Sequence, residues 1–241
     1  MPILALDGLT KRYGSLLVAD EVSLAVEAGE ALGVIGPNGA GKTTLFNLIA
    51  GGVRPDAGRI AFDGQDITRL APHARCRAGI ARSYQIPNPF AQMTVFENVM
   101  VGATFAGRRG GGAAAERTCV DVLHLTGLLP RANTLAGDLP LLARKRLELA
   151  RALATAPRLL LLDEIAGGLT EHECQELVET VRRVHRTGVS IIWIEHIVHA
   201  LVSVVSRLVV LNFGSVLAEG APRVVLDDPA VRDVYMGLPA E

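Results

Sequence analysis

Short apolar runs alternate with helical patterns along almost the whole chain. The clearest runs cover residues 31–35, 159–162 and 189–194, and turn residues or charges bound each of them. A short, continuously apolar run of this kind is typical of a strand that is buried on both faces of a parallel sheet. The pattern therefore predicts an α/β fold with a mainly parallel central sheet.

Two regions carry a different pattern, in which polar and apolar residues alternate between glycines. They are residues 1–30 and residues 59–63. Such alternation is typical of antiparallel strands with one face exposed to solvent. We therefore expect an antiparallel β-layer in addition to the central sheet.

Residues 94–154 contain no convincing strand pattern and are predicted to form helices. A glycine-rich stretch, GRRGGG at residues 107–112, interrupts them, and we interpret it as a surface linker rather than as a phosphate or RNA contact. The expected organisation is a single domain over residues 1–241. Residues 1–93 and 155–241 would form its core with the β-layer, and residues 94–154 an inserted helical subdomain.

Composition narrows the class of protein. Of the 241 residues, 49% are apolar and 20% are charged, with a net charge of −1. A chain of this size buries a core of its own, which excludes a disordered chain and a disulfide scaffold. Cys76, Cys119 and Cys174 lie far apart, so we interpret them as buried or incidental thiols in a reducing compartment. The balanced charge offers no basic stripe for nucleic acid.

The apolar content includes no predicted membrane span. The longest charge-free stretches near the C-terminus, residues 197–206 and 208–218, are split by Arg207, whereas a spanning helix needs about 20 apolar residues. The N-terminal sequence MPILALDGLTKRY has no basic start and no long apolar run, and it carries an acid at Asp7. This argues against a cleaved signal peptide, so we expect a cytoplasmic protein.

The apolar run at residues 31–35 leads into GPNGAGKTT and then into a pattern suited to a helix. This is the G-x4-G-K-[ST] pattern of a phosphate-binding loop, in the strand–loop–helix context that it requires. Backbone N–H groups would bind phosphate oxygens, Lys42 would reach the β- and γ-phosphates, and the Thr43 hydroxyl would ligate Mg²⁺. The expected nucleotide-binding residues are Gly36, Pro37, Asn38, Gly39, Ala40, Gly41, Lys42, Thr43 and Thr44.

Two acids, Asp163 and Glu164, directly follow the apolar run at residues 159–162. We expect them at the carboxyl end of a buried parallel strand, where such sheets bind ligands. Asp163 would hold Mg²⁺ through water, and Glu164 would orient or deprotonate the water that attacks the γ-phosphate.

A histidine, His196, follows the next apolar run at residues 189–194. An isolated histidine after a strand is usually an ordinary surface or core residue. Its expected position at the same sheet edge as the two acids favours a function instead. A neutral imidazole there could donate a hydrogen bond to the γ-phosphate.

The phosphate loop, the distant LLLLDE, the histidine after the following strand and the helical insertion together resemble the ATP-binding subunit of an ABC transporter. The resemblance covers essentially the whole chain and implies a P-loop NTPase fold that hydrolyses ATP with Mg²⁺. It also implies that Tyr13, in LTKRYG, stacks on the adenine. Gln85, in RSYQIPNPF, would sense Mg²⁺ and the attacking water and relay this to a membrane subunit.

Within that family, four segments look most like importers of branched-chain amino acids: IPNPFAQMTVFENV, RKRLELARAL, IEHIVHAL and EGAPRVVLDDPAVRDVYMG. The last segment predicts a strand, a turn and a short terminal helix. The resemblance implies two such ATPases driving two membrane permeases fed by a periplasmic binding protein, with this chain peripheral at the cytoplasmic face of the inner membrane. Other cargoes (urea, amides or exported lipid) and a soluble P-loop ATPase without a transport role stay open as alternatives.

The chain departs from the family in two places. Residues 139–143 read LPLLA where the family has LSGGQ, whose serine hydroxyl and glycine N–H groups bind the γ-phosphate held by the opposite subunit. Pro140 lacks an N–H, and the two leucines place Cβ atoms where the backbone must approach closely. We therefore favour a heterodimer with one stronger and one weaker ATP site over a homodimer. Residues 165–170, IAGGLT, lack a common proline and a final aspartate or asparagine, so Thr170 is expected to communicate less strongly across the dimer.

Overall fold

Two compact units make up the computed structural model, which describes residues 1–105 and 112–236. The first unit contains Met1–Pro72 and Ser190–Glu241, and the second contains His73–Val189. The GRRGGG stretch, apart from its last glycine, lies outside the described residues. The limits of the helical subdomain stay a prediction.

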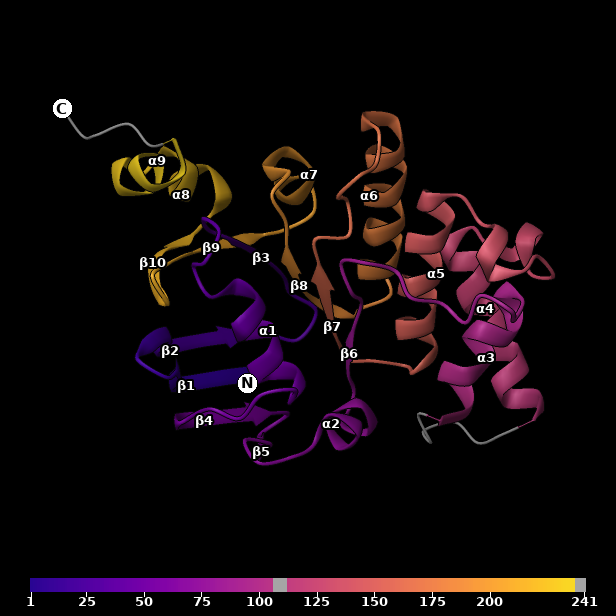
Figure 1. Cartoon of the computed structure of the whole chain (residues 1–241), viewed down its shortest axis with the longest axis horizontal. Coiled ribbons are helices and arrows are strands. Elements are labelled where there is room, and N and C mark those ends of the chain that lie inside the picture. Colours follow the sequence, from indigo (N-terminus) through magenta and orange to yellow (C-terminus); the bar gives the residue numbers. More distant parts are fainter. Residues whose placement is uncertain (106–111, 237–241) are drawn as a thin grey trace. The chain divides into compact units, whose positions relative to one another are not determined.

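An antiparallel sheet in the first unit has the strand order β2-β1-β4-β5. Its strands are β2 (Leu16–Val26), β1 (Leu4–Tyr13), β4 (Ala57–Phe62) and β5 (Gln65–Asp66), and Figure 1 shows the first three side by side. Along β1, Leu4, Leu6 and Leu9 are buried while Asp7 is exposed. The alternating pattern thus places one face against the core, and the predicted antiparallel layer is confirmed.

Parallel strands in the same unit position the phosphate loop. β3 (Ala31–Ile35) lies between β8 (Ser190–Ile194) and β9 (Arg207–Asn212) and pairs in parallel with both. β10 (Ser215–Gly220) returns antiparallel to β9. Every residue of β3 and β8 is buried, as their continuous apolar runs predict.

Helices follow the carboxyl ends of these strands. Helix α1 (Lys42–Ala50) begins directly after the loop that leaves β3, and α7 (Val198–Val202) follows β8. Leu45, Phe46 and Leu48 of α1 are buried, so the helix is fixed by its apolar face.

The C-terminal segment ends in two short helices, α8 (Pro222–Asp227) and α9 (Pro229–Met236). The sequence predicts a turn and a single terminal helix, so the structure differs here. The break falls at Asp228, whose backbone is extended. A residue before proline is disfavoured in the helical conformation, and Pro229 has no N–H with which to continue the helix.

The second unit combines two parallel strands with several helices. β6 (Ile80–Arg82) pairs in parallel with β7 (Leu159–Asp163). Its helices are α2 (Pro72–Ala78), α3 (Val95–Phe105), α4 (Ala113–Thr126), α5 (Leu141–Ala154) and α6 (Glu171–His185). Helices α3, α4 and α5 pack on one another, with short 3-10 turns at Leu129–Arg131 and Ala136–Asp138. Across the described ranges, every helix falls short of the length and hydropathy that a membrane span needs.

Candidate nucleotide site

Glycines allow the phosphate loop of the first unit to fold tightly. Gly39 and Gly41 have positive φ angles of 83° and 99°. A Cβ atom on Gly36 would lie 2.3 Å from the carbonyl oxygen of Leu211, and one on Gly41 would lie 2.4 Å from that of Val18. Because both distances are far below van der Waals contact, the loop can lie against β2 and β9 only with glycine at these positions.

Helix α1 presents an open N-terminus to this loop. Gly41 caps the helix without a side-chain hydrogen bond, and the first turn contains no acidic residue. Backbone N–H groups and the positive end of the helix dipole at such a terminus suit a phosphate group. Thr43, in the first turn, is exposed and carries a hydroxyl at the same end.

The ammonium of Lys42 lies against the start of the loop. The residue is only 6% exposed, and its Nζ donates to the carbonyl oxygens of Gly36 at 2.6 Å and Pro37 at 2.9 Å. A phosphate would offer anionic oxygens in place of these neutral carbonyls. An ammonium binds a charged acceptor more strongly, so Lys42 suits an incoming phosphate.

At the end of β1, Tyr13 leaves its ring accessible. The residue is 48% exposed, and the Lys11 Nζ lies 5.6 Å from the ring centroid. Asp56 in turn holds Lys11 through an ion pair of 2.7 Å. An exposed aromatic ring of this kind is available for stacking on a base.

His196 follows β8 in the first unit and is exposed. Its backbone N–H donates to the Oε2 atom of Glu195 at 3.1 Å, and Glu195 is only 1% exposed. The buried carboxylate therefore orders the backbone at the strand end, while the imidazole stays accessible to a ligand.

In the second unit, Asp163 is the last residue of β7 and is already paired with a cation. It is 6% exposed, and its Oδ2 accepts a hydrogen bond of 2.6 Å from the Nη2 atom of Arg82. The Arg82 guanidinium also lies 5.1 Å from the ring centroid of Tyr84. Arg82 was not predicted from the sequence, where its signal is only a cation at the end of a short apolar run, three residues before Gln85.

Gln85 and Glu164 are brought together although they lie far apart in the sequence. The Gln85 Nε2 atom donates to the Oε2 atom of Glu164 at 2.7 Å. Glu164 has a φ angle of 46°, in the left-handed region that costs a residue with a Cβ about 1 kcal/mol. Backbone strain of this kind concentrates at functional sites, which agrees with a chemical role for Glu164.

Charged side chains on α5 hold the loop that follows Gln85. Lys145 Nζ donates to the carbonyl oxygen of Gln85 at 3.3 Å, and Arg151 Nη1 donates to the carbonyl oxygen of Asn88 at 3.0 Å. Arg151 also pairs with Glu148 at 3.0 Å. Burial raises the pKa of Glu148, although the Arg151 charge and the Asn88 backbone oppose that shift. These roles of Lys145 and Arg151 could not be predicted from the sequence, because every residue carries a backbone carbonyl that can accept a hydrogen bond.

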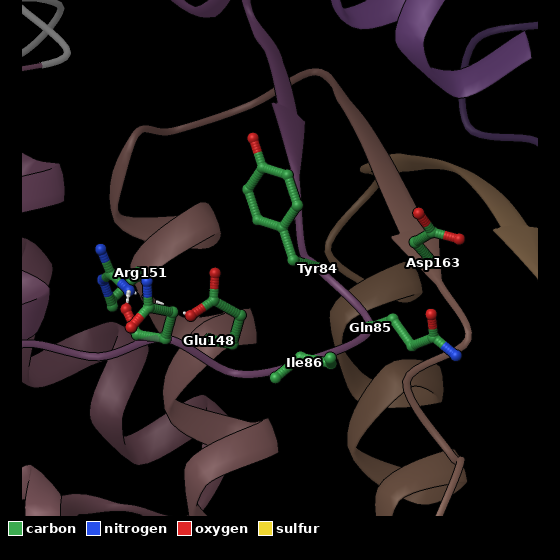
Figure 2. A pocket seen from close by; sticks show the side chains of 7 residues that line it. Tyr84, Gln85, Ile86, Glu148, Arg151 and Asp163 are labelled. Carbon is green, nitrogen blue, oxygen red and sulfur yellow. Dashed lines mark hydrogen bonds and ion pairs between the residues drawn. The ribbon is translucent and has the colours of Figure 1, made fainter. Parts of the chain in front are cut away.

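A pocket of about 530 Å³ lies between this part of α5 and Asp163. Figure 2 shows Glu148 and Arg151 at one side of it, Asp163 at the other, and the segment with Gln85 between them. The residues that line it are Tyr84, Gln85, Ile86, Asn88, Glu148, Arg151 and Asp163. Asp163, expected to bind Mg²⁺, and Gln85, the hydrogen-bond partner of Glu164, thus share this pocket with apolar side chains, of which Ile86 is 78% exposed.

The LPLLA segment forms the start of α5. Pro140 caps the helix with an extended backbone and no side-chain hydrogen bond, while its carbonyl accepts from the Arg144 N–H at 3.0 Å. Leu141 is 41% exposed. The helix therefore begins normally, yet it offers a proline and a leucine at the position where a polar, glycine-rich N-terminus would bind an anion.

Thr170 has a structural role that its position in IAGGLT did not reveal. It caps α6, with its hydroxyl accepting from the Glu173 N–H at 3.3 Å and its own N–H donating to Glu173 at 3.0 Å. This reciprocal pair is a capping box. The Thr170 backbone and hydroxyl bonds lower the pKa of Glu173.

The donor atoms fit a nucleotide carried with Mg²⁺. Mg²⁺ prefers oxygen ligands and usually combines one or two protein oxygens with phosphate and water. The Thr43 hydroxyl and the Asp163 carboxylate are donors of this kind. The chemistry of each side chain therefore suits its predicted role as a Mg²⁺ ligand, and Asp163 is also engaged by Arg82.

Comparison with known proteins identifies the family. The ABC transporter family model matches residues 19–167, so the chain belongs to the ABC transporter family and is an ATPase of the ATP-binding cassette type. A second model, described as branched-chain amino acid ATP-binding cassette transporter, matches residues 215–240. This range includes β10, α8 and α9.

Two relatives are named as high-affinity branched-chain amino acid transport ATP-binding proteins. BraF of Pseudomonas aeruginosa is 37% identical, with 98% of each chain covered. LivG of Escherichia coli is 36% identical, also with 98% of each chain covered. The lipopolysaccharide export system ATP-binding protein LptB of Acidithiobacillus ferridurans is 36% identical, over 98% of this chain and 97% of the relative.

A solved structure supports the fold. The crystal structure of the ADP conformation of an ATP-binding cassette of an ABC transporter aligns with a TM-score of 0.91 and 30% identity, covering 99% of this chain and 100% of that one. The predicted P-loop NTPase class of fold is confirmed.

Proposed function

We propose that this chain is the ATP-hydrolysing subunit of an importer for branched-chain amino acids or related small solutes. The observation that carries the ATP-dependent part is the phosphate loop, where Gly36 and Gly41 pack against backbone carbonyls and α1 presents an open N-terminus. The match of residues 215–240 and the relatives BraF and LivG support the cargo.

In this proposal the first unit binds the nucleotide. The N–H groups of the loop and the Lys42 ammonium bind phosphate oxygens, Tyr13 stacks on the adenine, and the His196 imidazole donates to the γ-phosphate. The loop residues are Gly36, Pro37, Asn38, Gly39, Ala40, Gly41, Lys42, Thr43 and Thr44.

The second unit contributes the groups that act on water. Asp163 would provide an oxygen ligand for Mg²⁺, as Thr43 would from the phosphate loop, and the bound ion would supply charge stabilisation at the phosphates. Glu164 accepts a proton from the attacking water, and Gln85, already bonded to Glu164, orients that water. Gln85 also lies in the loop held by α5, so it suits a relay to a membrane subunit.

Replacing Glu164→Gln tests the assignment of the base. The amide cannot accept the proton, so the rate of ATP hydrolysis should fall at least about 100-fold, while ATP affinity should stay within about threefold because the phosphate loop is intact. Phosphate release and binding of a fluorescent ATP analogue measure the two effects. Lys42→Ala is the contrasting variant and should lose binding itself. Unchanged hydrolysis in Glu164→Gln would remove Glu164 from this role.

A lipid-exporting transporter is the second candidate, favoured by the 36% identity with LptB. The match of residues 215–240 to the branched-chain amino acid model favours import. Co-expression with the membrane permeases of the transporter, followed by uptake of labelled leucine, separates the candidates. Uptake that needs this chain and Lys42 supports import, and its absence in a complex that hydrolyses ATP would contradict it.

The proposed partners are a second ATPase subunit, two membrane permeases and, indirectly, a periplasmic binding protein. With them the chain would lie peripherally at the cytoplasmic face of the inner membrane. We favour a heterodimer because Pro140 and Leu141 stand at the start of α5, where the backbone offers an opposing nucleotide few donors. The partner would supply the stronger signature segment.

A further inference from the structure

Asp163, the acid proposed to bind Mg²⁺, is occupied by a cation from its own unit. Arg82 Nη2 and Asp163 Oδ2 are 2.6 Å apart, and the two side chains are only 10% and 8% exposed. The strands β6 and β7 create this pair, because Arg82 lies opposite Leu161 in their parallel register. Its guanidinium therefore reaches along the sheet to the end of β7.

The burial of this ion pair determines what a second cation would meet. A short hydrogen bond between two charged groups is among the strongest in proteins, and a buried carboxylate is costly without such a partner. At this level of burial, water screens the guanidinium only weakly. A divalent ion that approaches Asp163 is therefore repelled by Arg82 and must compete with it for the carboxylate.

Tyr84 gives the guanidinium a second contact beside its ion pair with Asp163. The Arg82 guanidinium lies 5.1 Å from the Tyr84 ring centroid, within the range of a cation–π contact. Tyr84 is 56% exposed, and Figure 2 shows it on the segment that also carries Gln85. Arg82 can therefore give up Asp163 without losing every favourable contact.

We propose that Arg82 is a positioning residue that occupies Asp163 in the nucleotide-free chain and prevents a divalent cation from binding there alone. Mg²⁺ that arrives with ATP displaces Arg82, because the phosphates supply further ligands and negative charge. The inference rests on the proposed function of Asp163 as a Mg²⁺ ligand. It adds an order of binding, in which the cation enters with the nucleotide.

This proposal is tested by measuring Mn²⁺ binding in the absence of nucleotide, with electron paramagnetic resonance reporting the concentration of free Mn²⁺. Arg82→Gln should bind Mn²⁺ about tenfold more tightly than the wild type, or more. Arg82→Lys should bind as weakly as the wild type, because the charge is retained. Arg146→Gln, which removes a different arginine–carboxylate pair of the second unit, is the matched control and should leave Mn²⁺ affinity unchanged.

A double variant assigns the effect to Asp163. Adding Asp163→Asn to Arg82→Gln should abolish the gain in Mn²⁺ affinity. The proposal is overturned if Arg82→Gln binds Mn²⁺ no more tightly than the wild type, or if the gain persists without the Asp163 carboxylate.

Thermal unfolding of the wild type in the presence of Mg²⁺ tests the proposal without depending on an Arg82 variant that folds. Mg²⁺ alone should leave the Tm of the wild type unchanged, as it should for Asp163→Asn. A Tm increase in the wild type that Asp163→Asn lacks would show that Arg82 does not block the site. Binding of Mg·ATP to the wild type is measured separately, and its failure would contradict the proposed function. The Mn²⁺ and Mg²⁺ measurements without nucleotide test only the proposed role of Arg82.

Discussion

At the residue scale, the phosphate loop depends on the absence of single atoms. Gly41 combines a φ angle of 99° with the close approach of the Val18 carbonyl, so both conformation and space require glycine. Gly64 has a similar φ angle of 75°, but no atom lies within 4 Å of the position of its missing Cβ. A side chain at Gly41 would therefore meet both backbone strain and a steric clash, whereas a side chain at Gly64 would meet backbone strain alone.

We predict that Gly41→Ala lowers ATP affinity at least about tenfold and lowers the free energy of unfolding by about 2–3 kcal/mol, because the methyl group displaces the loop from β2. Gly64→Ala, the matched control, should cost about 1 kcal/mol and leave ATP affinity unchanged. Urea unfolding and titration with a fluorescent ATP analogue measure the two quantities. Equal affinities in the two variants would contradict the role of the close packing.

Glu30 shows how an acid outside the site is tuned by its surroundings. Its carboxylate accepts two hydrogen bonds from Arg207, at 2.7 and 3.0 Å, and Arg207 also pairs with Glu219. Burial raises the pKa of Glu30, but the Arg207 hydrogen bonds and charge and the Glu27 backbone together lower it below its ordinary value near 4.5. The pKa of Arg207 is raised by the same Glu30 bond.

The sign of this shift gives a pH dependence. A lowered carboxyl pKa contributes stability above the ordinary value, and that contribution is lost as the pH falls through the folded value. Glu30→Gln should therefore lower the free energy of unfolding by about 1 kcal/mol at pH 7, with the difference shrinking below about pH 4. Urea unfolding across this pH range measures it. A difference that stays constant down to pH 3 would disagree with the assigned cause.

At the scale of elements, helix α3 fixes the loop that begins at Gln85. Asn98 is fully buried, and its Nδ2 donates to the carbonyl oxygens of Phe90 at 3.1 Å, Met93 at 3.3 Å and Thr94 at 2.9 Å. Its Oδ1 accepts from the Phe90 N–H at 2.9 Å. One side chain therefore satisfies four backbone groups, while Lys145 and Arg151 on α5 hold the start of the same loop.

We expect Asn98→Ala to lower the free energy of unfolding by about 2–3 kcal/mol, because it removes four hydrogen bonds of a buried side chain and leaves the Phe90 N–H without its acceptor. Limited proteolysis should then cleave the loop at residues 85–94 faster than in the wild type. Asn88→Ala is the control, since the Asn88 residue is exposed and its loop contacts use the backbone. Equal proteolysis of the two variants would show that Asn98 does not hold this loop.

At the scale of the whole molecule, the chain is one ATP-binding cassette of a transporter and is proposed to act with a second one. The start of α5 is the segment that should serve the partner's nucleotide, and it carries LPLLA. The phosphate loop should serve the chain's own nucleotide. A dimer of two copies of this chain would then combine two intact phosphate loops with two weak signature segments.

Reconstitution with permeases tests this expectation. Two copies of this chain should hydrolyse ATP at least about tenfold more slowly than the chain paired with an ATPase subunit that carries LSGGQ. Replacing residues 139–143 with LSGGQ should raise the rate of ATP hydrolysis by the homodimer, whereas the same replacement combined with Glu164→Gln should not. Rapid hydrolysis by the unmodified homodimer would rule out the weak half-site.

Much of the site could be predicted from the sequence because its chemistry follows the chain locally. Lys42 and Thr43 stand in a contiguous loop between a strand and a helix, and Asp163 and Glu164 stand at the end of an apolar run. Buried strands must be apolar and phosphate loops must be rich in glycine, so these local patterns reveal both. The antiparallel layer could also be predicted, because the alternation of polar and apolar residues along its strands is a local pattern.

Only the tertiary structure decided which distant side chains meet. Arg82 reaches Asp163, and Gln85 reaches Glu164, because β6 pairs with β7. The hydrogen bonds from α5 to the segment that begins at Gln85 are accepted by backbone carbonyls. Every residue carries such a carbonyl, so the sequence does not indicate these contacts. The sequence by itself determined the chemical groups and the kind of fold, while strand pairing and burial determined their partners, because both depend on contacts between segments far apart along the chain.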